Sequence, residues 1–289
     1  MEICTAPSSS SEISPEPNYR RPFLKWAGGK FKILDAILAA LPPGERLVEP
    51  FVGSGVVFLN AGYAANVLAD SNPHLIGTLT NVQSRLDEVM AELQSLFIPA
   101  NNCEPAYYTL RDELNADPAP TPRHAALFMY LNRHCFNGLC RFNRSGGFNV
   151  PFGEYKTVSI PREDIMHFHD AANDATFTCA GFRETMAAAV PGDVIYADPP
   201  YAPLSGTAKF TSYDGKVFGE QEQRDLAEAA REAAARGVPV VISNHDTPFT
   251  RKLYAGAELR FFSVGRSISC KGEKRGKAPE LIAIFRPKA

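Results

Sequence analysis

Short apolar runs alternate with amphipathic stretches along most of this chain. Runs with strand character cover residues 46–50, 66–70, 176–180, 193–197, 239–243, 258–264 and 280–285, and apolar residues at helical spacing cover 56–63, 84–97, 104–115, 123–136 and 220–236. Strands that alternate with helices are typical of a parallel sheet with helices on its faces. The pattern therefore predicts an α/β fold that opens with a β-α-β unit of the Rossmann-like, nucleotide-binding type.

The middle of the chain differs in character from its two ends. Helical patterns within 84–172 are followed by a stretch rich in asparagine and glycine at 143–151, which predicts an inserted, mostly helical domain with a hairpin. The remaining parts, 20–83 and 173–289, would together form the sheet domain. Residues 1–19 are rich in serine and proline and bury little apolar surface, so they are expected to form a flexible tail.

Composition narrows the class of protein. The chain has 289 residues, 45% of them hydrophobic and 21% charged, which is ordinary for a globular protein. No apolar run approaches the roughly 20 residues that a membrane span needs, and the polar start does not resemble a secretion signal. We therefore expect a cytoplasmic protein without a membrane partner. The six cysteines lie scattered without a C-x-x-C pair, which argues against a metal site and against a disulfide framework.

The net charge of −2 does not by itself favour a nucleic-acid partner, but the charges are unevenly distributed. Residues 251–289 hold ten basic and three acidic residues, a surplus of seven positive charges. A second basic group, at 133–144, is interleaved with phenylalanines. Basic and aromatic side chains suit phosphates and bases respectively, although a solvated charged surface would have the same composition.

A glycine turn follows the first expected strand. It reads Gly53-Ser54-Gly55, and Phe58 stands in the place of the third glycine of a dinucleotide fingerprint. Asp70 ends the second strand, where a carboxylate can accept both hydroxyls of a ribose, or alternatively cap the next helix. The turn therefore favours a nucleoside without a pyrophosphate, such as S-adenosylmethionine, over a nicotinamide dinucleotide.

The tetrapeptide Asp198-Pro199-Pro200-Tyr201 ends a buried apolar run at 194–197. The Asp198 carboxylate and the Pro199 carbonyl can accept both protons of an exocyclic amine, while the Tyr201 ring can stack on a flat heterocycle. This combination suits methyl transfer onto the amine of a nucleobase. The same residues could instead form a strand-ending turn with a core tyrosine.

Several motifs occur together in one order. They are 23–30 (FLKWAGGK), 47–55 (LVEPFVGSG), 69–72 (ADSN), 137–141 (NGLCR), 148–153 (FNVPFG), 198–201 (DPPY) and 243–246 (SNHD). With these motifs the chain, from about residue 20 to 288, resembles the Dam family of DNA adenine-N6 methyltransferases. The resemblance implies a mostly parallel, seven-stranded, Rossmann-like methyltransferase sheet in which 84–172 is a target-recognition domain. It also implies double-stranded DNA as partner, with GATC as target and the adenine flipped out.

The resemblance also assigns roles to single residues. Asp198, Pro199 and Tyr201 would hold the flipped adenine. S-adenosylmethionine would contact Trp26, Lys30, Phe51, Gly53, Gly55 and Asp70, with Phe182 stacked on its adenine. DNA would contact Lys25, Phe136, Asn137, Leu139, Arg141, Pro151 and Tyr155. Phe136 replaces a tyrosine of close relatives and Glu154 replaces a basic residue, so some DNA affinity is expected to be lower.

Other functions remain open at this point. Similar turns serve methyl transfer to cytosine N4, to RNA or to a protein glutamine. A DNA-binding regulator could keep this fold without catalysis, and a nicotinamide oxidoreductase could use the glycine turn. For the expected enzyme we predict a monomer without an obligate protein partner, in a prokaryotic cell or encoded by a phage.

Overall fold

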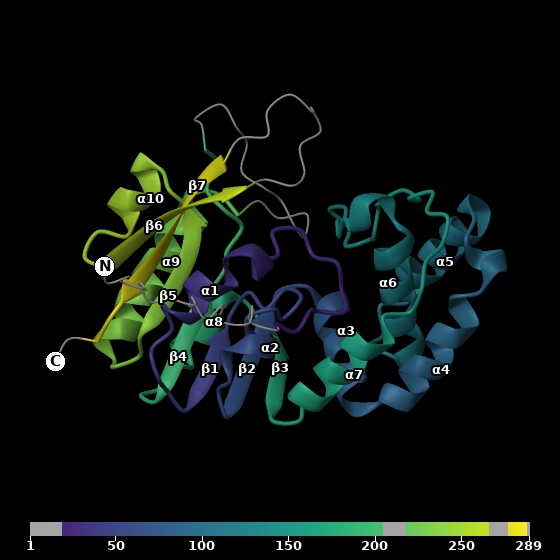
Figure 1. Ribbon diagram of the computed structural model, residues 1–289, viewed down its shortest axis with the longest axis horizontal. Helices are drawn as coiled ribbons and strands as arrows, with labels where there is room; N and C mark the ends of the chain where they lie inside the picture. Colours follow the sequence, from purple (N-terminus) through teal and green to yellow (C-terminus); the bar gives the residue numbers. More distant parts are fainter. Residues whose placement is uncertain (1–18, 205–217, 266–276, 288–289) are drawn as a thin grey trace, which may run out of the picture.

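A seven-stranded sheet forms the centre of the molecule. The computed structural model describes residues 19–204, 218–265 and 277–287. The strands are β1 (Arg46–Glu49), β2 (Ala65–Asp70), β3 (Ala175–Cys179), β4 (Asp193–Ala197), β5 (Val240–His245), β6 (Glu258–Gly265) and β7 (Lys277–Phe285), in the order β3-β2-β1-β4-β5-β7-β6 (Figure 1). β1 to β5 pair in parallel, and β7 runs antiparallel to β5 and β6. The predicted α/β fold with a mostly parallel sheet of seven strands is confirmed.

The central strands are buried on both faces. Every residue of β4 is buried, as are the first five of β5, which explains their continuous apolar runs. On one face Val48 and Ile195 pack in a core with Leu226 of α9 (Glu220–Ala235). The core of the other face includes Leu47 and joins the helices that follow β2. Short helices complete the two layers: η1 (Lys30–Ile33), α1 (Leu34–Leu38), α2 (Phe58–Ala61), α8 (Phe182–Ala187) and α10 (Pro248–Leu253).

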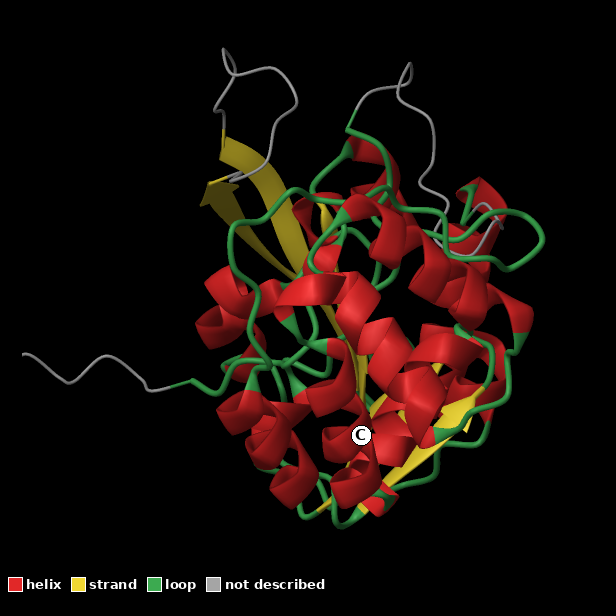
Figure 2. Ribbon diagram, turned by 90° about the vertical axis from the view of Figure 1, so that its right-hand side faces the viewer, coloured by secondary structure: helices red, strands yellow, loops and turns green. Residues whose placement is uncertain are grey.

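A helical lobe lies beside the β3 edge of the sheet. It contains α3 (Pro73–Ser84), α4 (Leu86–Leu96), η2 (Pro99–Asn101), α5 (Glu104–Ala116), α6 (Pro122–His134), η3 (Phe136–Gly138) and α7 (Arg162–Ala171). Seen from the lobe, these helices lie in front of the sheet (Figure 2). α6 is its centre, because nearly every one of its residues is buried. The division of the chain at residues 84 and 172 stays a prediction. α3 precedes residue 84 in the chain but packs against α6 of the lobe.

Several local expectations need correction. The helix expected at 56–63 is shorter than predicted and consists of α2 alone. The chain forms turns between Gly55 and the start of α2, and Gly62, with a φ of 73°, ends the helix. The hairpin expected at 143–151 stays a prediction; at its start the structure has an isolated antiparallel bridge between Phe142 and Phe148. α3 was not expected, although Asn72 caps it and Pro73 opens it, which is a recognisable start signal.

Some expectations lie outside the described residues. These include the tail, except for Tyr19, and the basic residues at 266–276. Of the C-terminal cations that are described, Arg251 pairs with Asp246, and both Arg260 and Arg286 pair with Glu258. The charge surplus of this end is therefore partly neutralised within the fold. The described cysteines, at positions 103, 135, 140 and 179, are thiols rather than halves of a disulfide. Within the described ranges no helix combines the length and apolarity of a membrane span, and no group of three or more potential metal ligands occurs.

Candidate active site

Acidic residues meet at the carboxyl edge of the sheet. β1 lies between β2 and β4, at the point where the strand order reverses, and open α/β sheets bind ligands in the crevice at such a switch point. Glu49 ends β1, Asp70 ends β2 and Asp198 follows β4. Parallel pairing of these strands brings the three carboxyl groups to one edge.

Asp198 is held by two side chains. Its Oδ2 lies 2.8 Å from the Lys30 ammonium, and its Oδ1 accepts a hydrogen bond of 3.0 Å from the Ser243 hydroxyl. Burial raises the pKa of Asp198, whereas the Lys30 charge and both hydrogen bonds act in the opposite direction. The two partners therefore orient the carboxyl group and favour its ionised form.

Lys30 also contacts the tyrosine of the tetrapeptide. Its ammonium lies 4.4 Å from the centroid of the Tyr201 ring and donates to the Gly28 carbonyl. A positive charge thus sits between a carboxylate and an aromatic ring, where both attract it. We call Lys30, Asp198, Tyr201 and Ser243 the acid–tyrosine corner. This corner favours a cation.

Neighbouring residues set the position of Tyr201. Its hydroxyl donates a 3.4 Å hydrogen bond to Glu280, and the His245 ring meets its ring edge-on at 4.8 Å. Within the described part of the chain, the Pro199 carbonyl accepts no hydrogen bond. Asp198 and Tyr201 share Lys30 as a neighbour, and Pro199 belongs to the same turn, as a site for an exocyclic amine requires.

The glycine turn (residues 53–55) packs against the single tryptophan of the chain. Gly53 and Gly55 have φ values of 50° and 77°, which side chains with a Cβ rarely adopt. A Cβ added to Gly53 would lie 2.9 Å from Trp26 Nε1, and the Gly53 N–H donates to Asp70 at 3.3 Å. The structure thus brings Trp26, both glycines and Asp70 together. The second Asp70 oxygen accepts from the Asn72 N–H at 3.0 Å, whereas the side chain that caps α3 is that of Asn72.

Glu49 is a candidate that sequence reasoning missed. Its side chain is only 2% exposed, and its Oε1 has no hydrogen-bond partner among the described residues. Burial raises the pKa of Glu49 well above its ordinary value, and the Asp198 charge adds to this effect. The available signal was an acid at the end of a buried strand, four residues before the first glycine of the turn. A buried carboxyl group with one oxygen orphaned fits a ligand that brings a positive charge.

Aromatic rings gather at the other end of the expected cofactor site. Phe51 and Phe182 stack at 5.6 Å between centroids, and Phe218 meets Phe51 edge-on at 5.7 Å. Phe182 opens α8, and Phe51 follows β1. The two phenylalanines expected to contact the cofactor therefore form one apolar surface.

The expected DNA contacts form two groups. Lys25 places its ammonium 4.7 Å from the centroid of the Tyr155 ring, and burial together with Arg133 lowers the pKa of Lys25. Its backbone exchanges two hydrogen bonds, of 2.9 and 2.8 Å, with the Asn132 side chain of α6. Four residues after Asn132, Phe136 is 51% exposed in η3, and its N–H donates to the Pro151 carbonyl.

The second group lies on the loop that follows η3. Arg141 is exposed and donates two hydrogen bonds to Asn149, one to the side chain at 2.8 Å and one to the backbone carbonyl at 3.1 Å. Asn137 is exposed with a φ of 54°, whereas Leu139 is half-buried and packs on the core. The structure thus presents Arg141 and Asn137 to the outside and holds Leu139 closer to the interior.

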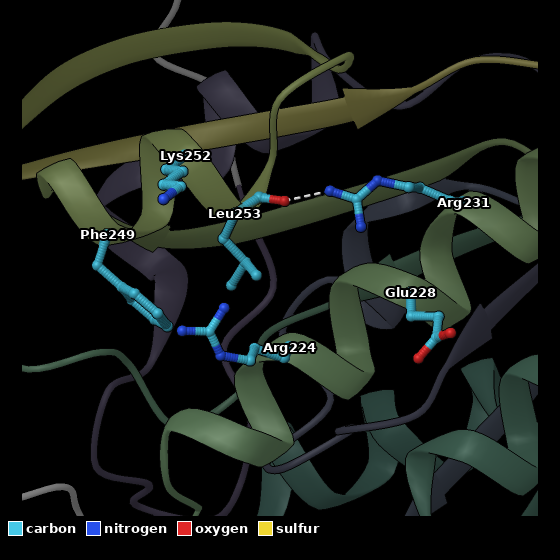
Figure 3. A pocket seen from close by; sticks show the side chains of 6 residues that line it. All are labelled: Arg224, Glu228, Arg231, Phe249, Lys252 and Leu253. Carbon is cyan, nitrogen blue, oxygen red and sulfur yellow. Dashed lines mark hydrogen bonds between the residues drawn. The ribbon is translucent and has the colours of Figure 1, made fainter.

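A separate hollow lies between α9 and α10. Its volume is about 520 Å³, and its lining residues are Arg224, Glu228, Arg231, Phe249, Lys252 and Leu253 (Figure 3). Arg231 donates to the Leu253 carbonyl, and Arg224 lies against Phe249 and pairs with Glu220. None of the expected site residues lines this hollow.

The fold and the site together define the class of protein. A glycine turn after β1 and an Asp-Pro-Pro-Tyr turn after β4, on a mostly parallel sheet of seven strands, are those of a Rossmann-like methyltransferase. The chain is 48% identical to the DNA adenine methylase of Escherichia coli (strain K12) over 267 residues, covering 92% of this chain and 96% of that protein. Identity is 47% with the DNA adenine methylase of Serratia marcescens, covering 92% and 98%, and 46% with that of Vibrio cholerae, covering 93% and 97%.

The chain belongs to the D12 class N6 adenine-specific DNA methyltransferases, whose family model matches residues 26–266. The expected resemblance and reaction are confirmed: the enzyme transfers a methyl group from S-adenosylmethionine to N6 of adenine in DNA. The alternatives on cytosine N4, RNA or glutamine, the regulator and the oxidoreductase are set aside. The residue roles stay predictions, which the geometry above supports.

Proposed function

We propose that this enzyme methylates the adenine of GATC in double-stranded DNA and draws that adenine out of the duplex into the acid–tyrosine corner. The observation that carries the proposal is the juxtaposition of Asp198, Pro199 and Tyr201 beside the glycine turn. We further propose that it acts as a monomer, in the cytoplasm of the bacterial cell whose DNA it modifies or of a cell infected by phage.

The residues around the glycine turn fit S-adenosylmethionine. The orphaned oxygen of the Glu49 carboxyl group matches the ammonium of its methionine part, and Asp70 can accept the ribose hydroxyls. Phe51 and Phe182 offer an apolar surface to its adenine, while Trp26 closes the turn against Gly53. When bound, the cofactor supplies an electrophilic methyl group.

The acid–tyrosine corner can make the adenine amine nucleophilic. The N6 lone pair is delocalised into the ring, so the amine attacks only if its geometry changes. Hydrogen bonds from its two protons to the Asp198 carboxylate and the Pro199 carbonyl draw N6 toward tetrahedral geometry. The negative charge of Asp198 also stabilises the positive charge that develops on N6, and this carboxylate can accept the proton that the methylated amine must lose. Lys30 now holds the same carboxylate, so its ammonium must move aside when the adenine stacks on Tyr201.

Base extrusion follows from the burial of the target inside the duplex. It costs a few kcal/mol, which stacking and hydrogen bonds in the pocket offset. Phe136 is exposed on η3, whose Gly138 packs against the Lys25 side chain, so the Phe136 ring can fill the space that the adenine leaves. Stacking requires only a ring, so the tyrosine of close relatives is not needed for this role.

Arg141 is oriented for reading a guanine. Its Nε and one Nη2 hydrogen are engaged by Asn149, which leaves three of its five N–H groups for a ligand. The Nη1–Nη2 edge can then donate two bonds to the O6 and N7 of guanine, worth about 1–3 kcal/mol of discrimination. The Asn149 contacts hold the guanidinium in place before DNA arrives.

The target is tested with duplexes that carry GATC or one of its single-base variants. The purified enzyme and labelled S-adenosylmethionine are added, and N6-methyladenine is mapped at base resolution. We expect methylation of GATC alone, and we expect Arg141→Ala to reduce the preference for the guanine about 10-fold or more. Arg144→Ala, on the same exposed loop, should keep the preference. Methylation of another site by the unaltered enzyme, or unchanged discrimination by Arg141→Ala, contradicts the proposal.

A further inference from the structure

Two fully buried amides hold the backbone on both sides of Tyr201. Asn244, in β5, accepts a 3.0 Å hydrogen bond from the Ala202 N–H, and Gln223, in α9, donates a 2.7 Å hydrogen bond to the Pro200 carbonyl. The Asn244 amide nitrogen donates to the Gln223 side-chain oxygen at 3.0 Å, which joins the two contacts. Neither side chain has any exposed surface. We call Asn244 and Gln223 the amide pair.

The orientation of Asn244 is determined by its other neighbours. Its oxygen also accepts from the His245 N–H at 2.8 Å, and its nitrogen also donates to the Tyr254 hydroxyl at 2.9 Å. Both donors and both acceptor positions of the amide are thereby used. Rotation of the group by 180° would set its NH₂ against two N–H donors. Only an amide satisfies all four partners at this position.

The amide pair therefore restrains the peptide groups that flank Tyr201. His245 adds a third restraint, because its Nδ1 donates to the Ala202 carbonyl at 2.7 Å. The ring of Tyr201 and the Pro199 carbonyl are parts of the same short turn, so their positions relative to Asp198 depend on these bonds. A misplacement of about 1 Å can cost roughly 100-fold in rate.

We propose that Asn244 and Gln223 are positioning residues for methyl transfer, which set the turn that receives the adenine without touching it. The proposal rests on the acid–tyrosine corner as the site of reaction. It extends the functional assignment from the turn to a buried network that links the turn to α9 and β5.

Asn244→Asp is the sharpest variant, because it keeps the size and the acceptor oxygens and removes both N–H donors. Its ionised carboxylate would face the Gln223 oxygen. Gln223 must then rotate to donate to it, which releases the Pro200 carbonyl. We expect kcat at about pH 8 to fall roughly 30–100-fold, with nearly unchanged affinity for S-adenosylmethionine and DNA. At lower pH, protonation of the introduced carboxylate restores one donor, so the loss should shrink.

Tyr254→Phe is the matched control. It removes the Tyr254 hydroxyl, which accepts a hydrogen bond from Asn244 and is not part of the Tyr201 turn. It therefore disturbs the same amide and should lower the melting temperature about as much as Asn244→Asp does. Its kcat should stay within about threefold of the unaltered enzyme. Gln223→Glu, which loses the donor to Pro200, should lower kcat as Asn244→Asp does. The kcat of the double variant should be little lower than that of the less active single variant, because both substitutions break the same set of hydrogen bonds.

The outcomes separate this proposal from the assignment of the site. A folded Asn244→Asp or Gln223→Glu with normal kcat, or losses that multiply in the double variant, overturns the positioning role. If Tyr254→Phe loses as much kcat as Asn244→Asp at equal stability, the role is merely structural and the proposal also falls. A normal kcat in Asp198→Asn would instead refute the assignment of the acid–tyrosine corner as the site of reaction.

Discussion

Replacing Asp198 with asparagine removes one negative charge and leaves the shape of the acid–tyrosine corner nearly unchanged. The amide oxygen can still accept a hydrogen bond from N6, so the substitution isolates the contribution of charge. That charge is desolvated and held by the Lys30 ammonium at 2.8 Å and the Ser243 hydroxyl at 3.0 Å. We therefore expect its loss to be felt in the transition state, when positive charge develops on N6.

The size of the effect follows from Coulomb's law. A unit charge about 3 Å from a carboxylate oxygen, at an effective dielectric constant of about 20, is stabilised by about 5 kcal/mol. Only part of a unit charge has developed in the transition state, so we expect a loss of about 4 kcal/mol, or roughly 1,000-fold in the rate of methyl transfer. Ser243→Ala removes one hydrogen-bond donor to the same carboxylate, together with the 3.0 Å contact of that hydroxyl with the Tyr196 hydroxyl, and leaves the Asp198 charge in place, so it should cost about 10-fold.

The assay is a single-turnover transfer of labelled methyl from S-adenosylmethionine to a duplex with one GATC site. Calorimetric titration of S-adenosylmethionine and a thermal melt of each variant serve as controls, and both should change little. Transfer by Asp198→Asn within about 10-fold of the unaltered enzyme would refute the electrostatic reasoning. So would equal losses in Asp198→Asn and Ser243→Ala.

Three further predictions concern the cofactor site and acid stability. Gly53→Ala forces a Cβ to 2.9 Å from Trp26 Nε1 at a φ of 50°, so it should cost about 1–3 kcal/mol of unfolding free energy and weaken S-adenosylmethionine binding, both measurable by denaturant melts and calorimetry. Glu49→Gln should weaken cofactor binding at least about 10-fold, while removing a group whose raised pKa lowers stability as pH increases above about 4.5; a variant that binds normally and keeps the unaltered pH slope contradicts this. Burial lowers the pKa of His134 to about 4 from 6.5, so the unfolded state binds more protons between these values and stability falls as pH falls through that window. Urea titrations at several pH values should show a loss of about 2–3 kcal/mol that His134→Gln abolishes and that a change at the exposed His167 does not; a flat profile would count against the buried neutral form.

The sheet was the most predictable part of the fold. The central strands contain short apolar runs, and β4 and the first five residues of β5 are buried. Helices with a clear apolar stripe, α4 to α6 and α9, were also predicted within two or three residues at their ends. The short helices α1, α8 and α10 were missed because five or six residues hold too little pattern to distinguish them from turns.

The site was predictable where chemistry is local and not where it depends on pairing across the fold. Asp198, Pro199 and Tyr201 are adjacent in sequence, and Gly53 with Asp70 follows from strand ends. The ion pair between Lys30 and Asp198 joins residues 168 positions apart, and no sequence pattern indicates it. Glu49 was overlooked because an acid at the end of a strand is a weak signal, and its burial with an unpartnered oxygen becomes visible only in the folded structure.

The segment from Lys25 to Lys30 has a consequence for how this enzyme could diversify. The Lys25 backbone is hydrogen-bonded to α6 of the helical lobe, Trp26 packs on the glycine turn, and Lys30 forms an ion pair with Asp198. Six neighbouring residues thus reach three regions of the molecule, so a substitution here is felt in all of them at once. The loop at 141–149 is anchored in the lobe by the buried rings of Phe142 and Phe148, but its exposed polar residues have hydrogen bonds mainly within the loop and to Asn115. Drift toward new target sequences is therefore expected to begin on that loop, while the early segment evolves slowly.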